Sequence, residues 1–117
     1  MEDLIADIAT ETGVDPAAAR QALGLILAFL RQEGPKTEVD ALFAGLPGAE
    51  EAAAATADGG EAGGGLMGLA SKLSDLGFGM GEMQAAGRQI FAYARARTGD
   101  EAVGQIVAAI PGLAQFL

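Results

Sequence analysis

The feature that most constrains this sequence is an internal repeat with an offset of 64 residues. A shift of 64 positions aligns residues 2–48 with residues 66–112 without a gap, and ten of the 47 aligned pairs are identical. Only four of these are Ala with Ala; the others include Gly13 with Gly77, Ile26 with Ile90, Arg31 with Arg95 and Pro47-Gly48 with Pro111-Gly112. Because a fixed sequence period marks a repeated supersecondary structure, the chain is predicted to contain one unit twice.

Each copy of the unit is predicted to form three helices. Apolar residues recur at helical spacing, and each such stretch ends at glycine or proline. The first unit is predicted to be helical over residues 2–12, from Pro16 to about Gly34 and over residues 37–46, and the second unit repeats this pattern. Three N-terminal caps are also predicted: Asp15, a capping box of Thr37 with Asp40, and Asp100.

The two units are separated by a segment that differs in composition from both. Residues 49–57 are nearly all Ala and Glu and could extend as a frayed helix, whereas residues 58–65 are rich in Gly and are predicted to be a flexible linker. The predicted organisation is a unit at 1–48, a linker at 49–65 and a unit with an apolar tail at 66–117. The predicted fold class is all-α, with two tandem three-helix units packed as one six-helix domain.

Departures from the repeat indicate how the halves could share one core. Large residues align with small ones in the two longest predicted helices: Leu23 with Gly87, Ala19 with Met83 and Leu30 with Ala94. If the halves pack around a pseudo-two-fold axis, such exchanges fill a common interior without overpacking it.

Charge and composition exclude several functions. The net charge of −9 repels phosphate backbones, so no nucleic-acid partner is expected. The chain has neither cysteine nor histidine, which removes thiolate nucleophiles and the commonest metal ligands. The G-x-G-x-x-G match at residues 63–68 has no strand before it, as a dinucleotide site requires. No catalytic residue, cofactor site or metal site is predicted, and the protein is not expected to be an enzyme.

The predicted location is the cytoplasm. The first residues, Met1-Glu2-Asp3, are acidic where a secretory signal would be basic. The longest uncharged apolar run, residues 102–117, is interrupted by Pro111-Gly112 and is shorter than the roughly 20 residues of a spanning helix. No transmembrane segment is expected.

Two groups of residues are candidates for an interaction surface. Arg31 and Arg95 occupy equivalent places near the ends of the long helices, where a cation suits the helix dipole but could also bind an anionic partner. The apolar end of the chain has no counterpart after the first unit. Apolar side chains are rarely left in solvent as a cluster, so these are predicted to pack either in the protein's own core or in an interface. These residues are Leu113, Phe116 and Leu117.

Several short motifs carry a resemblance to known proteins. They are V-D-P-A-A-A-R at 14–20, F-L-R at 29–31, L-P-G-A at 46–49, G-G-G-L-M-G-L-A-S-K-L at 63–73 and I-P-G-L at 110–113. With these motifs the chain resembles small bacterial helical proteins of unknown function, of the VcgC/VcgE-like kind. The resemblance implies a helical fold and supplies no catalytic residues.

Two functions are therefore considered from the sequence. The first is a non-enzymatic helical interaction or scaffold protein, self-associating as a homo-oligomer or binding another protein. The alternative is a module that binds a small molecule or lipid, with an apolar ligand held between the two halves.

Overall fold

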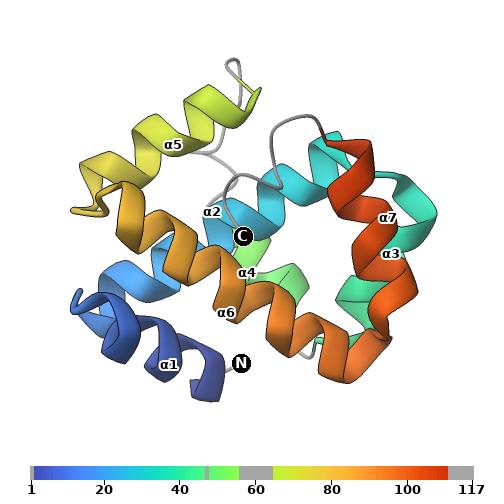
Figure 1. Cartoon of the computed structure of the whole chain (residues 1–117), viewed down its shortest axis with the longest axis horizontal. Coiled ribbons are helices and arrows are strands. Elements are labelled where there is room, and N and C mark those ends of the chain that lie inside the picture. Colours follow the sequence, from blue (N-terminus) through green and yellow to red (C-terminus); the bar gives the residue numbers. More distant parts are fainter. Residues whose placement is uncertain (1, 47, 56–64, 111–117) are drawn as a thin grey trace.

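The computed structural model describes residues 2–46, 48–55 and 65–110, which form seven helices and no strand (Figure 1). The all-α prediction is therefore confirmed, and one helix more than the predicted six is present. In chain order the helices are α1 (Glu2–Thr12), α2 (Pro16–Glu33), α3 (Lys36–Gly45), α4 (Ala49–Ala55), α5 (Gly65–Asp75), α6 (Met80–Thr98) and α7 (Asp100–Ala109).

Glycine and proline mark several helix ends, as the sequence predicts. Gly13 follows α1 with φ of 77°, and Gly77 follows α5 with φ of 99°, a left-handed backbone that glycine adopts without steric cost. Pro16 is the first residue of α2, where its missing N–H costs no hydrogen bond.

The predicted side-chain caps are wrong in detail. Asp15 stands at the N-cap of α2, but its side chain makes no cap hydrogen bond. Pro35, with φ of −65°, is the N-cap of α3, so that helix starts one residue before Thr37 and the predicted capping box does not form. Gly99 is the N-cap of α7, and Asp100 is already helical.

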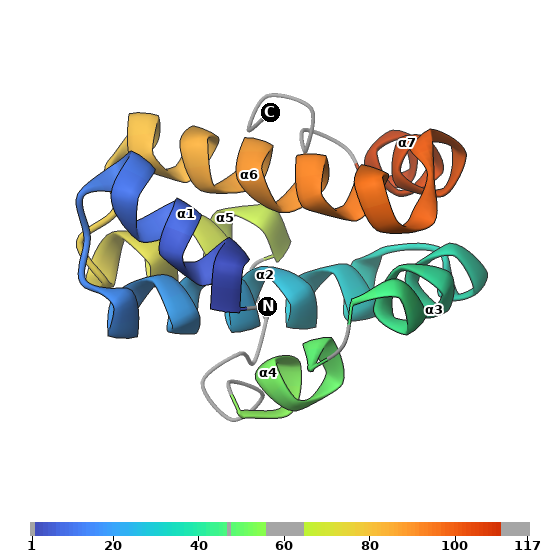
Figure 2. The same cartoon turned by 90° about the horizontal axis from the view of Figure 1, so that it is seen from below.

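The two long helices, α2 and α6, cross the molecule one above the other, as Figure 2 shows. α1 packs against both α2 and α6, and α5 packs against α2. At the other end of the molecule α3 packs against α7. The first helix of each half therefore contacts the long helix of the other half.

The core is apolar and is supplied unequally by the two long helices. α2 buries mainly large aliphatic residues, whereas α6 buries several small ones. Both members of each large-and-small pair predicted from the repeat are buried. The largest buried side chains of α2 and α6 are Leu23, Ile26, Leu27, Phe29, Leu30, Met83, Ile90 and Phe91.

The additional helix, α4, packs against α2 on the side away from α6 (Figure 2). Ala49 and Ala53 of α4 are buried. Their small side chains allow the backbone of α4 to come close to its neighbour. Part of the segment interpreted as a linker is therefore a packed helix, while residues 56–64 lie outside the described part of the chain.

Among the described helices, none alone has the length and hydropathy of a membrane span. The pair Glu2–Thr12 and Pro16–Gln32 meets those two criteria together, but the two helices are bent by 112° relative to each other.

Candidate interaction surface

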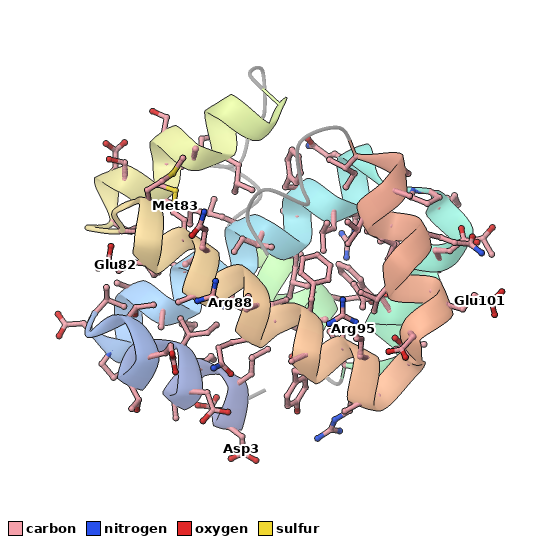
Figure 3. All side chains as sticks on the ribbon, viewed as in Figure 1. Asp3, Glu82, Met83, Arg88, Arg95 and Glu101 are labelled. Atoms are coloured by element: carbon pink, nitrogen blue, oxygen red, sulfur yellow. The ribbon has the colours of Figure 1, made fainter. Side chains whose placement is uncertain are left out.

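The exposed side of α6 carries two arginines that are seven residues apart. Because consecutive residues of an α-helix are rotated by about 100°, Arg88 and Arg95 point in nearly the same direction. Gly81 and Ala92 are exposed on the same side of the helix. Figure 3 shows Arg88 and Arg95 along α6. We call Gly81, Arg88, Ala92 and Arg95 the α6 outer face.

The two arginines of this face make few stabilising contacts with the rest of the protein. Arg88 takes part in no hydrogen bond or ion pair within the described ranges. The Nε of Arg95 lies 3.7 Å from Oδ1 of Asp100, and their side chains are 49% and 88% exposed. Such an exposed pair contributes at most about 1 kcal/mol. Arg95 also suits the C-terminal end of a helix, but Arg88 lies too far from that end for the helix dipole to favour it.

The adjacent helix, α1, has the opposite charge. It carries Glu2, Asp3, Asp7 and Glu11 and no basic residue. Asp3, Asp7 and Glu11 follow one another at intervals of four residues, a spacing at which like charges destabilise a helix by about 0.2–0.5 kcal/mol per pair. We call these three residues the acidic row.

Two exposed polar contacts link α1 to its neighbours. Nη2 of Arg20, on α2, donates to both carboxylate oxygens of Glu2 at 3.0 and 3.1 Å. Nε2 of Gln89, on α6, donates to Oε1 of Glu11 at 3.4 Å. Asp3 and Asp7 project between these two contacts, and in the described structure neither has a hydrogen-bond or ion-pair partner.

The predicted site residues do not form one cluster. The guanidinium of Arg31 lies over the ring of Phe43, 4.8 Å from its centroid, and so links the end of α2 to α3. Arg95 has no such ring, because the residue aligned with Phe43 is Val107. A different arginine of α6, Arg97, lies over Tyr93 of the same helix at 4.5 Å. Arg31 and Arg95 thus have different surroundings. The predicted tail residues lie outside the described residues: Leu113, Phe116 and Leu117.

A hollow of about 270 Å³ opens where α3 meets α4. Phe43, Leu46 and Gly48 line it together with Glu50 and Glu51. Both glutamates are exposed and belong to the first turn of α4, where they suit the positive end of the helix dipole. The hollow belongs to the first half and the segment that follows it, and so differs from the predicted ligand site between the halves.

The interior offers little polar chemistry in the part of the chain that the structure describes. No polar or charged residue is buried there. The same residues contain no group of three or more Asp and Glu side chains placed to hold a metal ion. The polar groups available for recognition are therefore those of the surface helices.

Arg88 was not among the residues singled out from the sequence. The repeat aligns it with Gly24, and an arginine in the place of a glycine is the signal that could have identified it. Comparison of the chain with protein-family models, with curated proteins and with solved structures gives no match. The resemblance to VcgC/VcgE-like proteins stays a prediction.

Proposed function

We propose that this protein is a non-enzymatic helical interaction protein that associates with itself. The observation that carries this proposal is the separation of charge between adjacent surface helices. Arg88 on α6 and Asp3 and Asp7 on α1 are exposed without an intramolecular partner in the described structure. Charged groups arranged in this way favour recognition of a complementary surface. General acid–base catalysis, in contrast, uses titratable groups placed in a pocket beside the reacting atoms.

We propose further that the fold is a tandem of two three-helix units. In support, α6 begins 64 residues after α2, and α7 begins and ends 64 residues after α3. The N–H of Leu46 donates to the carbonyl of Phe43 at 3.2 Å, and the N–H of Ile110 donates to that of Val107 at 3.4 Å. An experimental structure in which residues 2–46 and 66–110 fail to superpose would overturn this proposal.

The proposed setting is the bacterial cytoplasm. A chain without cysteine has no disulfide that would need an oxidising compartment. Fractionation of the producing cell, with the untagged protein detected by antibody, is the corresponding test.

Native mass spectrometry of the purified full chain tests the proposed function. We expect a dimer or a higher homo-oligomer whose population rises with protein concentration and that carries no added small mass. Monomer at every concentration up to about 1 mM, the upper end of weak association, would contradict self-association. A monomer carrying a bound small mass would instead favour the alternative, a module that binds a small molecule or lipid.

A further inference from the structure

We propose that the α6 outer face of one copy binds the α1 helix of a second copy, with Arg88 and Arg95 facing Asp3 and Asp7. This inference rests on the proposed self-association and names the two surfaces that meet. Its basis is the exposure of opposite charges on α6 and α1.

The side of α2 that corresponds to the α6 outer face carries only one charge. The repeat aligns the α6 outer face with four residues of α2: Ala17, Gly24, Ala28 and Arg31. Gly24 is buried, whereas Ala17 and Arg31 are exposed. On α6 the residue aligned with Gly24 is Arg88, which is exposed. The α6 outer face therefore has a second cation that α2 lacks.

The charge of the α6 outer face indicates what would fit on it. Two exposed arginines favour a partner helix that carries acidic residues on one side. The exposed side of α1 has this composition, since Asp3 and Asp7 lie there beside the small Ala6.

The spacing of the charges along the two helices allows both pairs to meet. At 1.5 Å per residue, Arg88 and Arg95 are separated by about 10 Å along α6, and Asp3 and Asp7 by about 6 Å along α1. The long, flexible side chains of the arginines span the difference. Each arginine can then neutralise one aspartate, which removes the like-charge repulsion within the acidic row.

The aspartates of the same chain do not pair with these arginines. The buried side of α1 carries Leu4, Ile5 and Ile8, so Asp3 and Asp7 lie on the exposed side of the helix. Neither aspartate forms an ion pair with Arg88 or Arg95, and the partner of Arg95 is Asp100, in a long and exposed pair. A second copy supplies both kinds of surface.

Charge reversal of each surface separately, followed by mixing, tests the proposal. One full-length variant carries Arg88→Glu with Arg95→Glu, and the other carries Asp3→Arg with Asp7→Arg. Each variant alone places like charges opposite one another, so its dissociation constant for self-association should rise by roughly tenfold or more. An equimolar mixture places opposite charges in contact again and should recover association. Sedimentation velocity of each variant and of the mixture gives the readout.

A matched control reverses two other exposed acids. Glu50→Arg with Glu51→Arg changes the net charge by the same amount as the α1 variant, but on α4, and should leave the dissociation constant within about threefold of that of the unaltered protein. Circular dichroism and the melting temperature establish that each variant is folded. If a double variant is unfolded, the single changes Arg88→Glu and Asp7→Arg repeat the test with half the perturbation.

The outcomes separate this inference from the proposed function. A monomeric unaltered protein would contradict self-association itself. An unaltered oligomer whose α6 and α1 variants both remain associated would place the interface elsewhere and overturn only the inference. Loss of association in both variants without recovery in the mixture would show that α6 and α1 do not face each other. Loss in the Glu50→Arg, Glu51→Arg control would assign the acidic partner surface to α4 and would also overturn the inference.

Discussion

The two long helices, α2 and α6, differ most on the sides that face away from the core. On α2, Gly24 is buried, and α4 packs against the helix. On α6, the aligned residue is the exposed Arg88. Glycine permits a second backbone to come close, whereas an arginine in the middle of a helix surface keeps it away unless a partner neutralises the charge. The two repeats therefore differ in charge and burial at this position of the long helices.

The core-facing sides of the same helices differ in residue volume. α2 buries Leu23 and Leu30 where α6 buries Gly87 and Ala94. A protein interior tolerates this asymmetry because packing depends on the total volume at a contact and not on which helix supplies it. The two helices are alike in length and placement, but a core residue of one does not fit at the aligned position of the other.

Replacing Gly24 of α2 by arginine, the residue aligned with it on α6, should give the largest loss of stability. Gly24→Arg would place a long charged side chain at a buried position of α2, and we expect a loss of about 3 kcal/mol in the free energy of unfolding from overpacking and charge burial. Urea denaturation measures the change. Gln21→Arg, at an exposed position of the same helix, is the control and should alter stability by less than about 0.5 kcal/mol. Equal effects of the two changes would mean that Gly24 is not buried in the folded protein.

A substitution that disturbs the contact between the ends of α3 and α6 should give an intermediate loss of stability. A methyl group on Gly45, at the end of α3, would collide with Cγ2 of Thr98. The residue that aligns with Thr98 is Gly34, which follows α2 as its C-cap. We expect Gly45→Ala to cost about 1 kcal/mol. Thr98→Ser removes that methyl group but retains the hydroxyl, which donates to the carbonyl of Ala94 at 2.8 Å.

Combination of these two changes sharpens the test. The double variant Gly45→Ala, Thr98→Ser should regain most of the stability that Gly45→Ala loses, which is a favourable coupling in a double-mutant cycle. Thermal unfolding of the four proteins gives the coupling energy. Strict additivity would show that the ends of α3 and α6 are not packed together.

The smallest expected losses of stability come from replacing the two arginines that the repeat aligns, and the two losses should differ. Arg31→Ala removes a guanidinium that lies over Phe43, and we expect a loss of about 0.5–1 kcal/mol. Arg95→Ala removes only a long, exposed ion pair with Asp100 and should cost less than about 0.5 kcal/mol. Chemical denaturation in parallel compares them. A larger loss for Arg95→Ala would reverse the roles assigned to the two residues.

Most of the helices could be predicted because apolar spacing and glycine or proline identify them directly. The end of α1 at Gly13 and the start of α2 at Pro16 agree with the sequence prediction. α4 was interpreted as part of a linker because its buried residues, Ala49 and Ala53, are too small to produce a clear apolar stripe. The start of α3 was misplaced because Pro35 fixes the turn by its ring, a constraint stronger than a hydroxyl cap.

The candidate surface was harder to predict than the fold. Arg31 and Arg95 align in sequence, but their environments depend on whether an aromatic ring follows at the right distance in space, and only Phe43 does so. Arg88 could not be selected from the sequence because exposed arginines are common. It becomes informative only when it is compared with its aligned residue, the buried Gly24. Helix pairing across the halves, such as α1 on α6, depends on tertiary packing that periodicity within one helix does not encode.

The packing of α1 against α6 also constrains how the chain acquires its fold. α1 is synthesised first, yet one of the helices that cover its apolar side begins only at Met80. Contacts between residues so distant in sequence must overcome a larger loop-closure entropy than contacts between neighbouring helices. The first half of the chain therefore cannot complete its structure before α6 is available. We expect folding to be a late, cooperative event that is slower than is usual for a helical protein of this length, with Leu4, Ile5 and Ile8 exposed until the second half has emerged.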